Sequence, residues 1–390
     1  MNQRQDPESV LKTVAATFES GDGPRALADL LDLMAREPGW IKGYTALAQL
    51  RWQLGDTTTF TQDFETAIAR HSATESLWVA YFETLMRARR LGTILMSLER
   101  GRADLGPRPI FNRFEAVAAA ENGDIGRADR AFARLKMAND TPLQLAYLRH
   151  LLRAQRAREA AQLGEAIVAK PDGRGAWSYL GTAWRLLDDP RWRWLEDQAG
   201  LVATVEVNVD LKSLADVLRR LHVTRLAPFG QTIRRGTQTQ GMLLDRPETE
   251  ITTLRAAFEA CISRFVAGLP PRDAKHPLLG PPRGELGFTG SWSVRLTDAG
   301  YHTNHTHPEG WVSSAFYVAL PGSLGADESN PAGWLALGQP PAELGLDLAP
   351  LQLIQPKPGR LALFPSTMWH GTLPFEAGER LTVAFDVQSR

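Results

Sequence analysis

Residues 380–387, Arg380-Leu381-Thr382-Val383-Ala384-Phe385-Asp386-Val387, alternate between apolar residues and residues that are polar or small. Successive side chains of a β-strand point to opposite faces of its sheet, so this alternation predicts a strand with one buried face. The segments 291–296, 312–320 and 360–364 alternate in the same way, and loops rich in Gly and Pro separate them. This pattern predicts a sheet sandwich or jelly roll in the C-terminal part of the chain.

The chain before residue 200 has a different periodicity. From about residue 8 to 200, Ala, Leu, Arg and Glu dominate, and segments such as 26–33 carry apolar residues at helical spacing. The turns recur too, because the pairs beginning at Gly21, Gly55 and Gly123 are each Gly-Asp and lie at multiples of 34 residues. A 34-residue helix-turn-helix period is typical of tetratricopeptide repeats, so we expect roughly five helix pairs. A generic helical bundle is the alternative, since the full consensus is poorly matched.

Between the two patterns, the segment 201–209 alternates like a strand, and 211–221 and 250–269 are predicted to be helices. The expected fold class is therefore α+β, with a boundary near residue 200.

Composition limits the class of protein. The 390 residues include 44 basic and 44 acidic side chains, so no overall charge favours nucleic acid or an anionic membrane surface. The single cysteine, Cys261, excludes an intrachain disulfide framework, and no Cys-x-x-Cys pair occurs. We see no apolar signal segment at the N-terminus and no run of about 18 apolar residues, so we expect a cytoplasmic protein that binds no membrane.

Histidines cluster near residue 305. His302, His305 and His307 fall within six positions, and His370 lies further along the chain. Imidazole is the commonest ligand of first-row metals near neutral pH. On a strand, residues i and i+2 share a face, so His305 and His307 can converge on one ion that His370 completes. The sequence therefore predicts a metal site.

The segment that contains His370 has an ordered pattern of its own: Pro358-Gly359-Arg360-Leu361-Ala362-Leu363-Phe364-Pro365-Ser366, then His370, then Arg380. With this pattern, the chain resembles the Fe(II)/2-oxoglutarate-dependent oxygenases of the prolyl-hydroxylase-like superfamily, in the branch fused to tetratricopeptide repeats. The resemblance covers about residues 225–390. Its motifs are Gly236-Thr237-Gln238-Thr239, the His-x-His-Pro-x-Gly-Trp segment at 305–311, Ser313-Ser314-Ala315-Phe316-Tyr317-Val318, and residues 356–387.

The resemblance implies a tetratricopeptide-like solenoid in residues 1–200 and a double-stranded β-helix, or jelly roll, with supporting helices in 201–390. It also implies Fe(II) and O2, with 2-oxoglutarate as cosubstrate. Arg380 would pair with the far carboxylate of 2-oxoglutarate, although a surface salt bridge with Glu379 or Glu376 is the alternative. Tyr317, Thr382 and Ser293 are further expected contacts of the cosubstrate, Tyr317 being equally compatible with a core aromatic.

Two ligand sets are weighed, with a role for His302 as a further alternative, because the usual pattern of the resembled family is His-x-Asp/Glu followed by a distant His. In the first, His305, His307 and His370 form a three-histidine site. In the second, His307 and Glu309 form the ordinary pair with His370, and the carboxylate partly neutralises the ion. In the resembled family, more residues usually separate the first ligand from the strand than separate His307 from Tyr317, which favours the first set. Pro308 and Gly310 also indicate that the chain is already turning at Glu309.

The expected function is a dioxygenase that hydroxylates a side chain of a peptide or protein recruited by the helical repeats. Two alternatives belong to other classes. One is a non-catalytic, repeat-based binding module with a degenerate jelly-roll metal site, and the other is a cupin-type metalloenzyme with three histidines and no 2-oxoglutarate.

Overall fold

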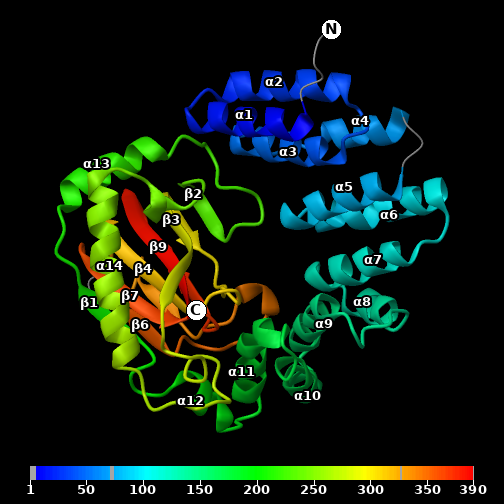
Figure 1. Cartoon of the computed structure of the whole chain (residues 1–390). Helices are drawn as coiled ribbons and strands as arrows, with labels where there is room; N and C mark the ends of the chain where they lie inside the picture. The colour runs from blue at the N-terminus through cyan, green and yellow to red at the C-terminus, as the bar shows by residue number, and fades with distance from the viewer. Residues whose placement is uncertain (1–5, 71–73, 326, 390) are drawn as a thin grey trace. The chain divides into compact units, whose positions relative to one another are not determined.

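The structure of the protein is a computed structural model that describes residues 6–70, 74–325 and 327–389 (Figure 1). The chain folds into two compact units. The first extends to Lys136 and takes in Val223–Gln231; the second contains Met137–His222 and Thr232–Arg390.

The helical part consists of twelve α-helices among the described residues before 200, which follow one another as six pairs, one more than predicted. They are α1 (Pro7–Glu19), α2 (Gly23–Arg36), α3 (Ile41–Gln53), α4 (Gln62–Arg70), α5 (Glu75–Arg87), α6 (Leu91–Leu105), α7 (Pro109–Glu121), α8 (Ile125–Phe132), α9 (Thr141–Arg153), α10 (Ala157–Val168), α11 (Trp177–Leu186), which follows the short 3-10 turn η1 (Gly173–Ala176), and α12 (Arg191–Glu196).

The periodic Gly-Asp turns end the first helix of a pair. Gly21, Gly55 and Gly123 all have φ between 81° and 101°, in the left-handed region that glycine adopts without a steric penalty. The aspartate after Gly123 then caps α8, accepting a hydrogen bond from Arg127 N at 3.0 Å. The other three pairs place Arg89, Gln155 and Asp188 in the same left-handed turn with φ of 53–58°. This explains why the glycine period has gaps in the sequence.

Segment 223–231 follows the helix at 211–221 in the sequence, but it belongs to the first unit. Trp52 Nε1 donates to Ala227 O at 3.1 Å, and Arg225 N donates to Gln53 O at 3.1 Å. Phe229 packs edge-on against Trp52 at 6.1 Å between ring centroids. This segment therefore completes the apolar core of the first unit.

The second unit contains two antiparallel sheets, as expected of a jelly roll. The larger has the strand order β1-β7-β4-β9-β3-β2 and the smaller the order β6-β5-β8. The strands are β1 (Ala203–Glu206), β2 (Ile233–Gln238), β3 (Leu286–His302), β4 (Val312–Ala319), β5 (Leu335–Leu337), β6 (Gln352–Ile354), β7 (Arg360–Pro365), β8 (His370–Thr372) and β9 (Glu379–Ser389). The short 3-10 helices η2 (Leu243–Asp245) and η3 (Ala342–Leu344) lie in the connections.

Two helices cover one face of the large sheet: α13 (Leu211–Leu221) and α14 (Thr249–Ala267) (Figure 1). Phe258 of α14 lies 5.2 Å from Phe316 of β4 and 4.7 Å from Phe385 of β9, measured between ring centroids. The odd-numbered residues of β9, such as Leu381 and Phe385, are thus in this core. The even-numbered ones, which include Arg380 and Asp386, point to the opposite face.

The last helices of the repeat series pack directly on the jelly roll. Trp369 Nε1 donates to Ser178 O at 3.2 Å and to Thr182 Oγ1 at 3.0 Å in α11. Arg174 in the preceding turn donates through Nε to Gly310 O at 3.1 Å. Residue 200 thus marks the change from helices to strands, while residues 137–200 belong to the same compact unit as the sheets. As a boundary between independent domains, residue 200 stays a prediction.

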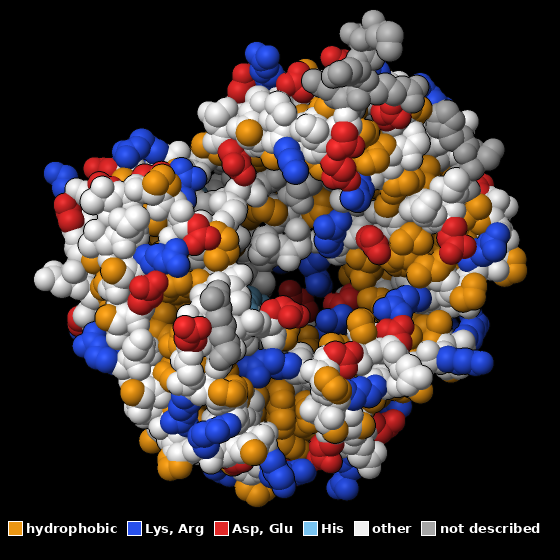
Figure 2. Space-filling model, viewed as in Figure 1, with side chains coloured by type: hydrophobic (Ala, Val, Ile, Leu, Met, Phe, Trp, Pro, Cys, Tyr) orange, Lys and Arg blue, Asp and Glu red, His pale blue; other side chains and the backbone are white. Residues whose placement is uncertain are grey.

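No helix in the part of the chain that the structure describes is long and apolar enough to cross a membrane. Acidic and basic side chains are interspersed on the face drawn in Figure 2, as the balanced composition predicts.

Candidate metal centre

Three histidines come together in the second unit. One imidazole nitrogen from each of His305, His307 and His370 lies within 4.8 Å of the others. His305 and His370 exchange two backbone hydrogen bonds, of 2.9 and 3.0 Å, in an isolated β-bridge just beyond β3 and at the start of β8. His305 and His307 both lie outside the named strands, contrary to the prediction that they share one. The backbone N–H of His307 donates to Ser366 O at 2.9 Å, which holds it beside β7.

Each of the three imidazoles is fixed through its Nδ1 atom. His305 Nδ1 lies 2.8 Å from Thr303 O, and His370 Nδ1 lies 3.0 Å from Met368 O. A carbonyl oxygen only accepts hydrogen bonds, so both Nδ1 atoms are donors. His307 Nδ1 lies 2.7 Å from Asp386 Oδ2.

Neutral imidazoles that donate through Nδ1 have a lone pair on Nε2, which is the atom left for a metal. Burial keeps the pKa of His305 and His370 well below its usual value, and the neighbouring histidines lower it further. Three imidazole nitrogens, each on a ring whose second nitrogen is held in place, fit a first-row transition metal.

Glu309 is exposed and is not part of this cluster. It lies in the turn 308–309, as Pro308 and Gly310 predicted. His302, at the end of β3, is stacked beside the cluster with its ring 5.9 Å from that of His305. Burial lowers the pKa of His302 to about 3, and the charge of Arg380 contributes to this shift.

Arg380 and Tyr317 form a second group in the second unit. Arg380 is 2% exposed and Tyr317 is fully buried. The guanidinium carbon lies 5.1 Å from the centre of the Tyr317 ring, and Nη1 donates to Gly333 O at 2.7 Å. Among the residues described, Arg380 Nε and the Tyr317 hydroxyl have no hydrogen-bond partner. Glu379, the alternative partner of Arg380, instead pairs with Arg219 and Arg295.

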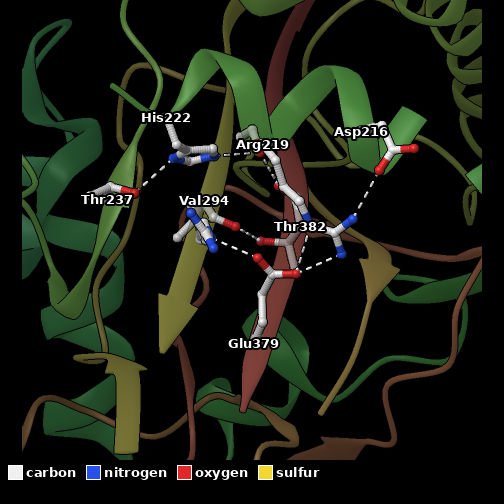
Figure 3. A network of polar contacts seen from close by, with 9 residues as sticks. Asp216, Arg219, His222, Thr237, Val294, Glu379 and Thr382 are labelled. Atoms are coloured by element: carbon white, nitrogen blue, oxygen red, sulfur yellow. Dashed lines mark hydrogen bonds and ion pairs between the residues drawn. The ribbon is translucent and has the colours of Figure 1, made fainter. Parts of the chain in front are cut away.

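Thr382 shares a face of β9 with Arg380 and stands opposite Tyr317 in the sheet. Ser293 does not join them, and its predicted role in cosubstrate binding is wrong for a geometric reason. Ser293 stands opposite Val383, whose side chain is in the helix-covered core, so it points to the other face. There its hydroxyl lies 3.1 Å from Nε2 of His222, whose Nδ1 lies 2.8 Å from Thr237 Oγ1 (Figure 3).

Asp386 was not predicted from the sequence. It is 9% exposed and contacts His307, although it lies 79 residues away in the chain. One sequence signal could have found it, because Asp386 continues the series of positions 380, 382 and 384 on one face of an otherwise apolar strand. A carboxylate there is expected to be buried and to need a partner.

Comparison with known proteins agrees with this geometry. Residues 290–386 match the model of a family described as "Putative 2OG-Fe(II) oxygenase". No match was found among curated proteins.

Solved structures similar to this chain are of two kinds. A collagen prolyl hydroxylase of Paramecium bursaria Chlorella virus-1 is 14% identical, with 49% of this chain and 97% of that chain covered and a TM-score of 0.32. A prolyl-4-hydroxylase of Pseudomonas putida is 17% identical, with 52% and 97% covered and a TM-score of 0.32. A tetratricopeptide repeat protein of Parabacteroides merdae is 10% identical, with 48% and 76% covered and a TM-score of 0.37. Likenesses this distant give no information on activity or substrate.

Residues 290–386 thus match the 2-oxoglutarate–Fe(II) oxygenase family model, and helix pairs with tetratricopeptide-like turns precede this segment. The family match includes His305, His307, His370, Arg380 and Asp386 within its bounds.

Proposed function

We propose that the protein is an Fe(II)- and 2-oxoglutarate-dependent dioxygenase that hydroxylates a side chain of a peptide or protein. His305, His307 and His370 would hold the iron through Nε2. In this family, bound iron couples the oxidative decarboxylation of 2-oxoglutarate by O2, which gives succinate and CO2, to insertion of the second oxygen atom into a substrate C–H bond.

The observation that carries the proposal is the unpaired, buried Arg380. Within the described ranges, no carboxylate forms a salt bridge with its guanidinium group, and Nε is without a partner. Burying a cation without an anion is costly, so the pocket is suited to an anionic ligand. The far carboxylate of 2-oxoglutarate has the charge and the planar shape that a guanidinium group pairs with, and the Tyr317 hydroxyl offers a further donor.

The repeats support a protein or peptide as substrate. Stacked helix pairs form extended surfaces that suit peptides better than small metabolites. In the second unit, Trp369, the residue before His370, hydrogen-bonds to α11. A substrate held on α9–α11 would therefore lie on helices in contact with the segment that carries a proposed ligand. The cytoplasmic location expected from the sequence belongs to this proposal.

The test is to incubate the full-length protein with Fe(II), 2-oxoglutarate and O2 and to measure succinate. We expect slow succinate formation without substrate, loss of it in His370→Ala, and its retention in Glu309→Ala. Iron binding without 2-oxoglutarate binding would instead support a three-histidine metalloenzyme of another kind. Absence of both would support a non-catalytic binding module.

The substrate can be sought by retaining cell proteins on the immobilised chain. A captured protein is then incubated with the loaded enzyme, and mass spectrometry should find a peptide heavier by one oxygen atom. No such gain on any captured protein would contradict a protein substrate.

A further inference from the structure

Asp386 is a carboxylate placed directly behind one of the three histidines. Its Oδ2 lies 2.7 Å from His307 Nδ1, and its Oδ1 accepts a hydrogen bond from Ser313 Oγ at 2.6 Å. Ser313 stands opposite Asp386 where β4 pairs with β9. Both carboxylate oxygens are thus engaged, and His307 is held with its Nε2 directed away from Asp386.

Two further residues fix the carboxylate. Ser366 Oγ lies 2.8 Å from Ser313 Oγ. Ser313 has one hydroxyl proton and gives it to Asp386, so we assign Ser366 as the donor of this second bond. Gly310 provides the space, because a Cβ atom there would lie 2.6 Å from Ser366 Oγ and 3.3 Å from Asp386 Cβ. The chain therefore builds a specific pocket around this carboxylate.

No Lys or Arg side chain among the described residues pairs with this carboxylate. Asp386 is 9% exposed, and its ion-pair contact is to His307. A buried carboxylate without a basic partner is costly. A divalent ion on the far side of the His307 ring would supply the compensating positive charge through the imidazole.

We infer that Asp386 is a positioning residue that orients His307 and supplies, from behind it, the negative charge that a carboxylate ligand provides in the usual His-x-Asp/Glu site. The inference rests on the metal site of the proposed function. A three-histidine site leaves the full charge of the ion uncompensated, whereas three histidines with Asp386 carry the same charge as two histidines and one carboxylate. Removing a carboxylate that hydrogen-bonds to a metal-binding histidine typically weakens metal binding about 10–100-fold.

Two substitutions separate charge from orientation. In Asp386→Asn the amide oxygen can accept from His307 and the amide nitrogen can donate to Ser313, so that the contacts survive without the charge. In Asp386→Ala both are lost. The control is Ser314→Ala, because Ser314 is buried beside Ser313 but points to the opposite face and bonds to the backbone of Phe385.

The measurements are the Kd for Co(II) in the full-length protein, the visible absorption of the bound Co(II), and the thermal midpoint without metal. We expect Asp386→Asn to weaken Co(II) binding about 10-fold or more, with an altered spectrum and no loss of stability in the metal-free protein. Asp386→Ala should weaken binding at least as much, and Ser314→Ala should leave the affinity and the spectrum unchanged. An unchanged Kd in Asp386→Asn would overturn the inference, and so would weaker binding in Ser314→Ala to the same extent.

The experiments distinguish a wrong role for Asp386 from a wrong oxygenase proposal. If the wild type forms succinate from 2-oxoglutarate but Asp386→Asn binds Co(II) equally well, the oxygenase proposal survives and the role of Asp386 falls. If the Asp386 variants lose Co(II) as expected but the wild type never consumes 2-oxoglutarate, the role of Asp386 survives and the oxygenase proposal falls.

Discussion

Arg380 lies against the ring of Tyr317, with 5.1 Å between its guanidinium carbon and the ring centre. Both side chains are buried, and the Tyr317 hydroxyl and Arg380 Nε have no hydrogen-bond partner among the described residues. Two unsatisfied donors in one buried place are uncommon in folded proteins, and an acceptor ligand would satisfy both. This pair, more than the histidines, is why we propose an anionic ligand.

Replacing Arg380 by Met keeps much of the side-chain volume and removes the charge. We expect 2-oxoglutarate affinity to fall by about 2–5 kcal/mol, while Co(II) affinity stays the same. The metal-free protein should be as stable as the wild type or more stable, because an unpaired buried cation is removed. Isothermal titration calorimetry measures both affinities. Equal 2-oxoglutarate affinity in Arg380→Met would refute the assigned role.

The ligand set can be tested by Co(II) affinity in single alanine variants. His305→Ala, His307→Ala and His370→Ala should each lose metal binding, because each variant leaves only two of the three imidazole ligands. Glu309→Ala should bind Co(II) normally, since Glu309 is exposed and outside the cluster. The opposite result, with Glu309 required and His305 dispensable, would favour the His307/Glu309 set.

Trp369→Phe tests the packing of α11 on the jelly roll. The substitution removes the indole N–H that serves Ser178 O and Thr182 Oγ1, both in buried residues, so we expect a loss of about 1–3 kcal/mol in the free energy of unfolding. The control is Trp192→Phe, since no hydrogen bond from the indole of Trp192 is found in the described structure. Chemical denaturation measures both, and equal losses would show that the hydrogen bonds of Trp369 contribute little.

The repeat turns give a prediction for backbone strain. At Gly123, φ is +81° and a Cβ atom would meet nothing within 4 Å. Gly123→Ala should therefore destabilise the first unit through conformation alone, by roughly 1–2 kcal/mol. Gly39 has equal space but no positive φ, so Gly39→Ala should be neutral within about 0.5 kcal/mol. If both variants unfold at the same denaturant concentration, the left-handed turn is not the constraint.

The buried carboxyl group of Glu196 should make the stability of the protein depend on pH. Glu196 is 7% exposed at the end of α12, its Oε1 has no partner, and burial raises its pKa to about 8. A carboxyl group with a raised pKa in the folded state binds its proton more tightly there. The folded protein therefore loses stability as the pH rises from about 4.5 to about 8, by up to about 1.4 kcal/mol per pH unit.

Glu196→Gln should remove this loss, and unfolding of both proteins at pH 5 and pH 8 measures it. The variant and the wild type should be similar at pH 5 and differ at pH 8, where the variant is more stable. A constant difference between them across this range would show that Glu196 does not titrate as expected.

Local patterns in the sequence predicted much of the fold. The helices at 211–221 and 250–269 and the strands at 312–320, 360–364 and 380–387 were each found within a few residues of their predicted bounds. The helical period was found as well, because the left-handed turn at Gly21, Gly55 and Gly123 selects glycine. The turns at Arg89, Gln155 and Asp188 could not be found in this way, since these residues adopt the same φ against their own preference.

In the candidate site, too, local patterns predicted some residues and long-range pairing decided others. His305, His307, His370 and Arg380 were proposed from residue type and order, and the structure brings the three histidines together. Ser293 was expected to contact the cosubstrate but faces the helix-covered side, because the register of β3 against β9 is set by long-range pairing that spacing along one strand does not reveal. The same pairing brings Asp386 to Ser313 and His307, and no local pattern links these residues.

The sequence alone therefore determined which elements form and which residues are candidate metal ligands, because backbone preferences and side-chain donors are local properties. The tertiary structure decided which nitrogen of each histidine faces inward and which carboxylate stands behind His307. It also left Arg380 buried without an anion. These are contacts between segments up to 79 residues apart, fixed by strand register and by the packing of the two sheets.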